Sequence, residues 1–387
     1  MKLLIISHTP HYRKEDQVVG WGSTIREIDH LARIFTDVTH LAPLYQGTAP
    51  DSSLPYTNPK VRFAPVGPAG GNSLLEKMSY LWQIPDWIAK MRFEINKADA
   101  IHLRCPAGIS LVGLLVYCLL GKRKPCWVKY AGNWQPGKKD PASYKLQRIL
   151  LQKNIHHGVV TVNGQWLGQP NHVTSFINPS FSKADWTIAK SIAKEKQLAL
   201  PLELLFVGRV EEEKGVGRVI EIAAGLLDSS VDFHFTIVGD GKNRSVYEDL
   251  VRQMGLADRF SFVGWINRQK LTKYYERASM ILLPSTASEG WPKVLSEAMA
   301  YGVVPLASDV SSIPQIFKET GAGHAFPAEE TQLFVDQILQ YTQDRSSWKE
   351  ASKIAVEAAD RFTYETYLEA VKNLFYKRWK VELNAEG

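Results

Sequence analysis

The sequence predicts an α/β protein made of two doubly wound domains, each with a parallel sheet covered by helices. Its 387 residues exceed what one ordinary hydrophobic core holds, which favours two domains. Short apolar runs alternate with longer helical patterns from start to finish, as in repeated βαβ units. The hydrophobic share of 45% and the charged share of 22% are typical of a globular protein.

The predicted elements fall into two successive series. In the first half, the expected strands are 2–7, 37–42, 61–64, 100–104, 126–129, 158–162 and 172–176. The helices between them are expected at 24–35, 74–96 and 143–154. In the second half, strands are expected at 204–207, 233–238, 260–263, 280–283 and 303–307, with helices at 216–227, 244–254, 269–277 and 294–301.

A linker is expected at 178–200, which begins with the turn-forming residues Asn178, Pro179 and Ser180 and continues as a polar, lysine-rich stretch. The first domain is therefore expected to cover 1–180 and the second 181–363. The tail at 364–381 is amphipathic and rich in aromatic residues. We expect it to form a helix, within about 364–387, that packs on the first domain.

Composition argues against several classes of protein. Three cysteines show no paired metal-binding spacing, so a reducing compartment is expected. The apolar run at the N-terminus is too short for a signal peptide. The longest apolar stretch, 108–121, is shorter than the roughly 20 residues that span a bilayer. The sequence therefore predicts a cytoplasmic protein without a transmembrane segment.

Positive charge is concentrated in the first half. The whole chain carries a net charge of +6, but residues 1–180 hold 21 lysines and arginines against 11 acidic residues. Between 101 and 153, ten basic residues accompany a single acidic one, Asp140. This bias indicates either a solvated basic surface or a surface that meets an anionic partner.

The first candidate motif is the loop 208–215, directly after a predicted strand. Gly208 allows the chain to turn there, and Gly215 opens the next helix. Arg209 offers a planar guanidinium and Lys214 a compact positive charge. Two cations in one strand-end loop suit a diphosphate, although neutralisation of the neighbouring glutamates is an alternative.

The second candidate motif follows the strand 280–283 and enters a helix near Pro292. Helix N-termini present unpaired N–H groups, which favour anions. Glu289 lies in the loop and Glu297 in the helix, so their carboxylates could accept hydrogen bonds from two sets of hydroxyl groups. A helix-dipole role for Glu289 and ordinary exposure of Glu297 remain alternatives.

These motifs carry a family resemblance. The spacing of Glu289 and Glu297 matches the E-x7-E element of retaining GT-B glycosyltransferases, and EGWPKVLSEAMAYGVVPLAS resembles the signature of glycosyltransferase family 4. LLFVGRVEEEKG, FTIVGDG and FVGWI precede it in the order that this family shows. The resemblance covers about 120 residues strongly and the first half only weakly. It implies a GT-B fold, two Rossmann-like domains facing across a cleft.

The resemblance also implies roles for single residues. Arg209 and Lys214 would hold the donor diphosphate near Gly208, and Glu289 would accept hydrogen bonds from the donor sugar. Glu297 would bind the ribose, while the base would rest near Trp265 and Ile266. The backbone beside Glu289 completes the expected donor site: Gly290, Trp291, Pro292, Lys293 and Val294. The family commonly has E-G-F-G where this chain has E-G-W-P, and Pro292 lacks an N–H to donate.

The first half offers weaker candidates. Gly20-Trp21-Gly22-Ser23-Thr24 opens the first helix, and in the family a glycine-rich loop there lies near the donor phosphates. Here Trp21 and Gly22 are cleft candidates, although a plain turn is the alternative. The loop after the strand 126–129 lacks the histidine that many relatives have. The remaining acceptor-side candidates are His8, His11, Asn133 and Trp134.

The sequence therefore predicts a metal-independent transferase that moves a sugar from a UDP- or GDP-sugar to an acceptor hydroxyl. Retention of configuration follows from the resemblance alone. No cofactor and no nucleic-acid partner are expected, and the resemblance suggests the synthesis of an envelope polysaccharide, exopolysaccharide or glycolipid. The alternatives are a sugar-nucleotide isomerase or epimerase on the same fold, and a non-catalytic sugar-nucleotide binder.

A membrane surface is the expected place of the acceptor. The segment 78–97 sets Trp82, Trp87 and Phe93 beside basic side chains. Such a helix suits a lipid headgroup layer, although packing against the first sheet is the commoner arrangement. We therefore expect peripheral association with the inner membrane face and a saccharide or lipid-linked acceptor.

Overall fold

The computed structural model describes residues 1–69, 74–120, 124–135, 141–287 and 290–384, and for 74–81 the backbone alone. The chain divides into two compact units. The first comprises residues 1–177 and 367–387, and the second comprises 178–366. The sequence analysis places this division after residue 180 and adds a C-terminal helix to the first domain.

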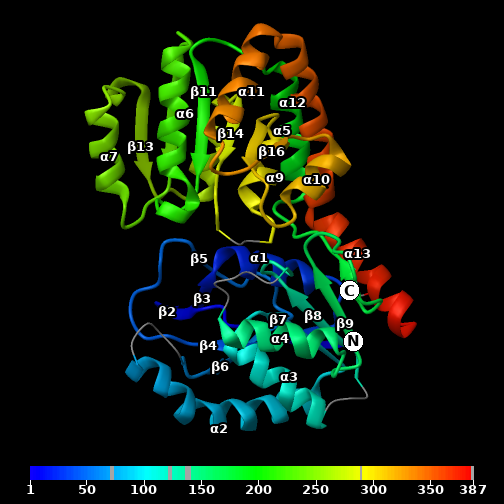
Figure 1. Cartoon of the computed structure of the whole chain (residues 1–387). Coiled ribbons are helices and arrows are strands. Elements are labelled where there is room, and N and C mark those ends of the chain that lie inside the picture. The colour runs from blue at the N-terminus through cyan, green and yellow to red at the C-terminus, as the bar shows by residue number, and fades with distance from the viewer. Residues whose placement is uncertain (70–73, 121–123, 136–140, 288–289, 385–387) are drawn as a thin grey trace. The chain divides into compact units, whose positions relative to one another are not determined.

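The first unit is built on a parallel sheet of seven described strands in the order β10-β9-β8-β7-β1-β4-β6. The strands are β1 (Lys2–Ile6), β4 (Asp37–Pro43), β6 (Val61–Val66), β7 (Ala100–Cys105), β8 (Cys126–Tyr130), β9 (Val159–Val162) and β10 (Val173–Ser175). Its helices are α1 (Gly22–Leu31), α2 (Leu74–Lys97), α3 (Gly108–Leu120), α4 (Ala142–Gln152) and most of α13 (Tyr364–Trp379). Figure 1 labels these elements.

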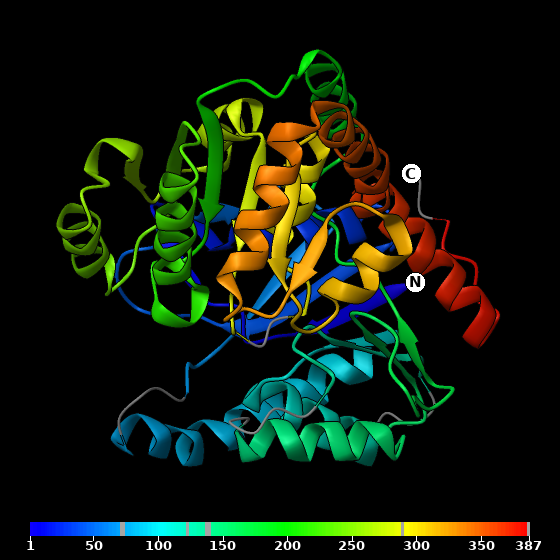
Figure 2. The same cartoon turned by 45° about the horizontal axis from the view of Figure 1, so that its top comes forward.

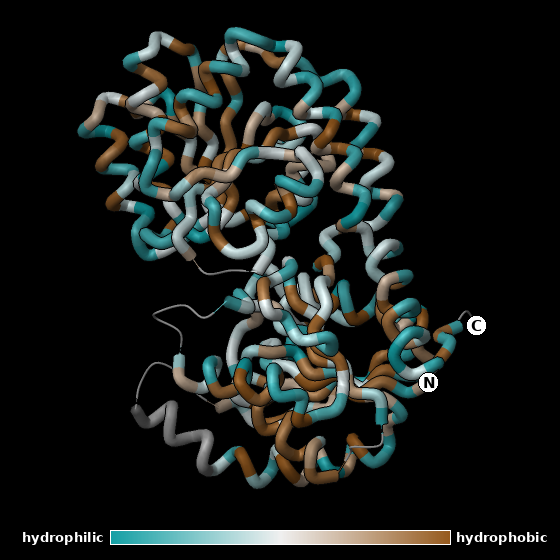
Figure 3. Tube along the Cα trace, turned by 45° about the vertical axis from the view of Figure 1, so that its right-hand side comes forward, coloured by the Kyte–Doolittle hydropathy of each residue, from teal (hydrophilic) through white to brown (hydrophobic). Residues whose placement is uncertain are grey.

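Alternation along β1 explains the two cores of this unit. Successive side chains of a strand point to opposite faces of the sheet. Leu4 and Ile6 belong to the core that contains α2 and α3 residues, whereas Leu3 and Ile5 belong to the core with α1 and α13. In Figure 3, hydrophobic residues gather along the strands inside the unit. The C-terminal helix thus completes one face of the first sheet.

A second, antiparallel sheet was not predicted. It contains β2 (His11–Lys14), β3 (Gln17–Trp21) and β5 (Ser53–Pro55) in the order β2-β3-β5. The residues 20–24 open the first helix as predicted, since α1 begins at Gly22, but Gly20 and Trp21 end the strand β3, which was not predicted. Short strands with few apolar residues give little signal in the sequence.

The second unit contains a parallel sheet with the order β13-β12-β11-β14-β15-β16. Its strands are β11 (Leu202–Val207), β12 (Phe233–Val238), β13 (Phe260–Gly264), β14 (Met280–Leu283), β15 (Val304–Ser308) and β16 (His324–Phe326). The helices are α5 (Lys183–Glu195), α6 (Val216–Asp228), α7 (Arg244–Gln253), α8 (Arg268–Arg277), α9 (Lys293–Ala300), α10 (Ile313–Thr320), α11 (Thr331–Gln343) and α12 (Arg345–Ala359). Figure 2 shows helices around these strands, where α6 packs on α11 and α9 on α12.

The predicted linker at 178–200 is wrong in its main part, because it contains the helix α5. Ser182 caps this helix by accepting a hydrogen bond from the N–H of Asp185, whose side chain in turn accepts one from the N–H of Ser182. Trp186, Ala189 and Ala193 are buried. The helix is therefore part of the second unit.

The concentration of positive charge within 101–153 does not correspond to one exposed patch. Arg104 and Lys129 form ion pairs with the buried Glu27. The ammonium group of Lys124 donates to three backbone oxygens, and Arg148 donates to the hydroxyl of Tyr130. These four cations stabilise the interior, which corrects the interpretation of the whole segment as a surface.

Two doubly wound α/β units confirm the predicted fold class. Within the apolar stretch 108–121, Gly108–Leu120 form α3, on which Leu119 is 84% exposed and Leu115 is 46% exposed. Among the described helices, none combines the length and apolar character needed to cross a bilayer.

Candidate active site

The predicted donor residues of the second unit gather at one edge of its sheet. The strands β13, β11 and β14 are parallel, so their carboxyl ends lie at the same edge. The loop 208–215 follows β11, Trp265 and Ile266 follow β13, and the loop to α9 follows β14. This is the edge at which doubly wound sheets bind ligands.

The loop after β11 needs glycine at close backbone contacts. A Cβ atom on Gly239, which follows β12, would lie 1.8 Å from the carbonyl oxygen of Gly208. Gly215 has φ 92°, and a Cβ atom there would lie 2.1 Å from the carbonyl oxygen of Pro284. Only glycine fits such positions without displacing the neighbouring backbone. The ends of β11, β12 and β14 are therefore packed directly on one another.

Hydrogen bonds fix the loop 208–215 to the loop after β14. The carbonyl oxygen of Glu213 accepts from the N–H of Thr286 at 2.9 Å and from the hydroxyl of Ser285 at 3.0 Å. The guanidinium of Arg218 donates to the carbonyl oxygen of Pro284 at 2.6 Å. These bonds hold the segment that carries Arg209 and Lys214 beside the segment that leads into α9.

The two predicted diphosphate ligands differ in exposure. The side chain of Arg209 is 63% exposed, and its Nη1 lies 2.9 Å from a carboxylate oxygen of Glu211. Lys214 is buried, with 7% of its surface exposed. Burial lowers the pKa of the Lys214 ammonium, and the positive charge of Arg209 lowers it further, while Glu213 and Glu211 raise it. An arriving anion would favour the charged form of this lysine.

The N-terminus of α9 follows two buried residues, Gly290 and Trp291. Pro292 is its N-cap and Lys293 its first residue, followed by Val294. Trp291 is buried and stacks on Phe362 with ring centroids 5.1 Å apart, so it contributes backbone rather than side chain to any ligand site.

The loop before α9 is anchored from a neighbouring helix, because the carbonyl oxygen of Gly290 accepts a hydrogen bond from the hydroxyl of Ser312 at 2.8 Å. Glu289, predicted to contact the donor sugar, lies outside the described residues.

Glu297 lies on α9 and is held by two side chains of α8. The hydroxyl of Tyr275 donates to its Oε2 at 3.2 Å, and Nε of Arg268 lies 3.6 Å from its Oε1. The Glu297 side chain is 14% exposed. Burial raises the pKa of Tyr275 well above its usual value, and the Glu297 carboxylate raises it further, so this phenol stays a donor at neutral pH. The carboxylate is oriented, and its Oε1 is not a hydrogen-bond acceptor of Arg268 at that distance.

The arginine that faces Glu297 follows the predicted base-binding residues. Arg268 begins α8, two positions after Ile266 in the chain. Trp265 is 46% exposed and available for stacking, while Ile266 is partly buried. The structure therefore brings the loop after β13 to the helix that carries Glu297.

Sequence reasoning missed Arg268 and Tyr275. Tyr275 lies within the predicted helix 269–277 and Arg268 directly precedes it, but nothing in the spacing relates that helix to Glu297. The contact depends on β13 lying two strands from β11 in the sheet, which the chain order does not reveal. Co-variation between these positions and Glu297 among homologues would have been the signal for their contact.

The candidates of the first unit lie in or beside the antiparallel sheet and at the end of β8. Trp21 is 52% exposed at the end of β3, and Gly22 begins α1. A Cβ atom on Gly22 would lie 2.6 Å from the carbonyl oxygen of Ser52, and one on Gly20 would lie 2.7 Å from the His11 ring. Both glycines are therefore required by packing inside this unit.

Two of the acceptor-side candidates are buried. His11 is completely buried, with Nδ1 2.9 Å from the carbonyl oxygen of Thr9 and Nε2 2.8 Å from the hydroxyl of Tyr56. Trp134 is 4% exposed and packs edge-on against Tyr130. In this structure neither side chain has a surface for an acceptor, so both assignments are corrected to structural ones.

The other two candidates are more accessible. Asn133 is partly buried and accepts a hydrogen bond from the N–H of Gln135, and His8 is exposed after β1. Within the described part of the chain, no group of three or more His, Cys, Asp or Glu side chains could hold a metal ion.

Known proteins resemble both the second unit and the complete fold. Residues 189–361 match the sequence model of a family described as Glycosyl transferases group 1. The amylovoran biosynthesis glycosyltransferase AmsK of Erwinia amylovora is 30% identical over 171 residues, which are 43% of this chain and 41% of that protein. The chain thus spans less than half the length of this curated relative.

Solved structures are similar over nearly the whole chain. A sucrose-phosphate synthase from Thermosynechococcus elongatus has a TM-score of 0.70 at 17% identity and covers 98% of this chain and 99% of its own. HepE of Anabaena, solved in complex with UDP-glucose, has a TM-score of 0.67 at 16% identity over 97% of this chain and 100% of its own. At these identities the likeness shows the fold. The chain therefore has the GT-B fold, and the segment that matches the glycosyltransferase sequence model lies within its second unit.

Proposed function

We propose that this protein transfers a sugar from a nucleoside diphosphate sugar to an acceptor hydroxyl with retention of configuration. The observation that carries the proposal is the fixed arrangement of Arg209, Lys214 and the α9 N-terminus at one sheet edge, within the segment that matches the glycosyltransferase domain. Cations and a helix N-terminus suit the diphosphate, whose negative charge grows as its bond to the sugar breaks.

The reaction needs one bond to form and one to break. The acceptor oxygen attacks the anomeric carbon as the bond from that carbon to the diphosphate oxygen breaks, and the acceptor proton passes to the departing diphosphate. Lys214 and Arg209 stabilise the charge that develops on the leaving group. Because these cations can supply that stabilisation, we propose that no metal is required.

Glu297 is proposed to receive the ribose hydroxyls, with the base near Trp265 and Ile266. Tyr275 and Arg268 leave part of the Glu297 carboxylate free to accept further hydrogen bonds. HepE is known with UDP-glucose, which makes UDP the first nucleotide to test, with GDP next.

The proposed product is a cell-envelope saccharide, exopolysaccharide or glycolipid. AmsK is named for amylovoran biosynthesis, which supports a polysaccharide or glycolipid pathway here. We propose that the enzyme works in the cytoplasm.

We further propose that the enzyme visits the inner membrane face. On α2, Trp82 is 81% exposed and Phe93 is 57% exposed, and Lys90 and Arg92 are exposed on the same helix. On the neighbouring α3, Leu119 is 84% exposed. Exposed aromatic and basic side chains suit an anionic headgroup layer. Trp87 is buried and belongs to the core, so it has no part in this surface.

Two experiments test these proposals. A panel of nucleotide sugars, assayed for free nucleoside diphosphate with and without saccharide acceptors, tests the reaction. Formation of an isomerised sugar nucleotide without net release of nucleoside diphosphate would contradict transfer. Sedimentation with anionic vesicles tests membrane association. Trp82→Ser with Phe93→Ser should weaken binding, whereas Leu167→Ser, which removes a fully exposed apolar side chain outside α2 and α3, should not. Equal binding of all variants would contradict the proposed surface.

A further inference from the structure

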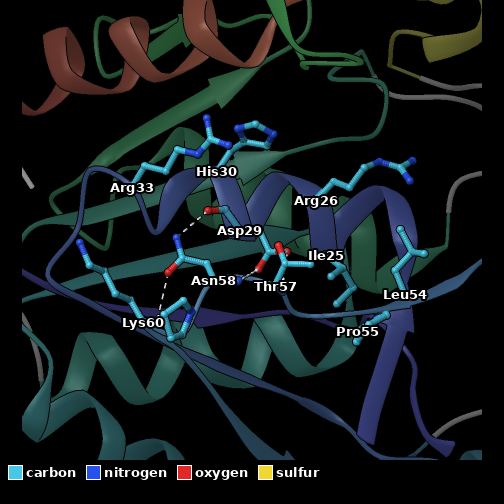
Figure 4. Close-up of a pocket in the computed structure, with 11 residues that line it drawn as sticks. Ile25, Arg26, Asp29, His30, Arg33, Leu54, Pro55, Thr57, Asn58 and Lys60 are labelled. Atoms are coloured by element: carbon cyan, nitrogen blue, oxygen red, sulfur yellow. Dashed lines mark hydrogen bonds between the residues drawn. The ribbon is translucent and has the colours of Figure 1, made fainter. Parts of the chain in front are cut away.

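A hollow of about 850 Å³ lies inside the first unit, between α1 and the segment after β5. Its volume is in the range of small-molecule sites. Arg26, Asp29, His30 and Arg33 line it from α1 and the turn that follows, as Figure 4 shows. Residues 54–55 and 57–60 form the opposite wall. No residue assigned above to the donor site lines it.

Asp29 fixes the opposite wall to the helix. Its carboxylate accepts from the N–H of Thr57 at 2.9 Å, from the hydroxyl of Thr57 at 2.8 Å and from the N–H of Asn58 at 3.3 Å. The Asn58 side chain donates to the Asp29 carbonyl oxygen and accepts from the N–H of Lys60. The Asp29 carboxylate is therefore engaged by the opposite wall, and among the described residues it forms no ion pair with either arginine.

The arginine side chains of the hollow lack partners. Among the residues that the structure describes, neither Arg26 nor Arg33 forms a side-chain hydrogen bond or an ion pair, and the Nε atom of Arg26 is buried. In Figure 4 the two guanidinium groups lie at opposite ends of the row of lining residues. Lys60 also lines the opposite wall. The two arginines outnumber Asp29, which is the acidic residue that lines the hollow.

We propose that this hollow binds a phosphoryl group of the acceptor. A guanidinium matches phosphate geometry with two parallel hydrogen bonds, and a buried Nε without a partner gains one from such a ligand. The identification of the ligand as an acceptor rests on the proposed glycosyl transfer, whereas the anion site itself does not depend on that reaction. It assigns to the first unit an anion site that is separate from the diphosphate site of the second unit.

Binding of inorganic phosphate, measured by titration calorimetry, tests the site without turnover. Four proteins are compared: the unchanged chain, Arg26→Gln with Arg33→Gln, Arg13→Gln and Lys214→Ala. Arg13 is an exposed arginine of the same unit that does not line the hollow. The double variant should bind phosphate at least about tenfold more weakly, as expected for lost charged hydrogen bonds. Arg13→Gln should bind phosphate like the unchanged chain, and Lys214→Ala should keep the binding that the double variant loses.

Each other outcome overturns the proposal. If Lys214→Ala alone removes binding, the phosphate occupies the donor site. If the unchanged chain binds no phosphate, or all four proteins bind it equally, the hollow is not a phosphate site. Matching thermal unfolding of the double variant and the unchanged chain shows that lost binding does not come from misfolding.

A second arm distinguishes the source of the phosphoryl group. A soluble sugar phosphate, such as glucose 6-phosphate, is compared with phosphatidic acid in otherwise neutral vesicles. Competition with inorganic phosphate by the sugar phosphate alone indicates a soluble acceptor, and competition by the vesicles alone indicates a lipid-linked one. Competition by neither overturns the proposal. Nucleotide-sugar cleavage that persists in the double variant would separate failure of this site from failure of the proposed reaction.

Discussion

The two units have similar architecture but differ in where their charged side chains lie. In the first unit, the buried Glu27 meets Arg104 at 2.8 Å, Lys129 at 2.6 Å and the hydroxyl of Tyr367 at 3.0 Å. In the second unit, the central strands β11 and β14 are almost wholly apolar, and charged groups gather in the loops beyond them. The first unit thus places ionisable groups where they determine stability, and the second places them where a ligand can reach.

Histidines show the same difference. Eight of the ten histidines lie in the first unit, and His11, His40, His102 and His156 are completely buried there. The hydroxyl of Tyr56 links His11 and His40, and Ser7 contacts Nε2 of His40 at 2.7 Å. Substitutions of these buried groups in the first unit should therefore mainly alter stability and its pH dependence, whereas those in the strand-end loops of the second should alter donor binding and turnover.

The largest effect is expected from Glu27→Gln. The change leaves Arg104 and Lys129 buried without their negative partner, which costs about 3–5 kcal/mol of unfolding free energy. Chemical denaturation should show the loss. Glu369→Gln is the matched control, because Glu369 pairs with Lys372 at the surface and should contribute at most about 1 kcal/mol. Equal losses from both changes would contradict the contrast between interior and surface.

Lys214→Ala should have the largest effect on catalysis. If Lys214 contacts the departing diphosphate, its removal costs roughly 3–4 kcal/mol of transition-state stabilisation, or about 100- to 1000-fold in rate. The unfolding free energy should change little, since a buried ammonium with a lowered pKa contributes no net stability. Lys318→Ala, an exposed lysine of the same unit, should leave turnover unchanged. A turnover loss below tenfold would remove Lys214 from the mechanism.

Glu297 and Glu289 should affect different kinetic constants. Glu297→Ala should raise the KM for the donor about 10- to 100-fold, because ribose contacts exist in the ground state and the transition state alike. Glu289→Ala should mainly lower kcat. Tyr275→Phe removes only the hydrogen bond that orients Glu297, and should raise the donor KM by less than Glu297→Ala does. Small, equal effects of the two glutamate changes would contradict the division of roles.

The sequence predicted the helices and strands that have a regular hydrophobic pattern. Most of the parallel strands are apolar runs buried on both faces, so their positions, and with them the strand-end loops of the donor site, were recognisable. The three-residue strand β16 is only partly buried and was not predicted. The strand β2 (His11–Lys14) has no such run, and α5 buries mainly small alanines on a lysine-rich helix. For this reason, neither β2 nor α5 was predicted as a regular element.

The sequence did not predict the contacts between side chains of different elements. The burial of His11 and Trp134, and the bonds from α8 to Glu297, depend on which elements become neighbours. The spacing of parallel strands in the sequence predicts the sheet edge at which a ligand binds. It does not identify the side chains that orient the ligand-binding residues.

The smallest expected effect is a change in acid sensitivity at His156. Burial lowers the pKa of His156 to about 4, and the nearby His172, His157 and Arg378 lower it further. Neither ring nitrogen has a hydrogen-bond partner among the described residues. Between pH 6.5 and about 4 the unfolded chain therefore binds a proton that the folded chain does not, so stability falls as the pH falls.

Replacing His156 by Leu removes this proton from the unfolded chain. The unfolding free energy of the variant should decline less steeply between pH 6.5 and about 4, with a difference of about 1 kcal/mol at roughly pH 5.5 relative to its value at neutral pH. His157→Asn is the matched control, since the neighbouring histidine is exposed. Denaturant titrations across this range measure the slope, which is independent of any constant loss from repacking. An unchanged slope in His156→Leu would mean that His156 is protonated in the folded chain, and the acid sensitivity of the first unit would then have to come from its other buried histidines.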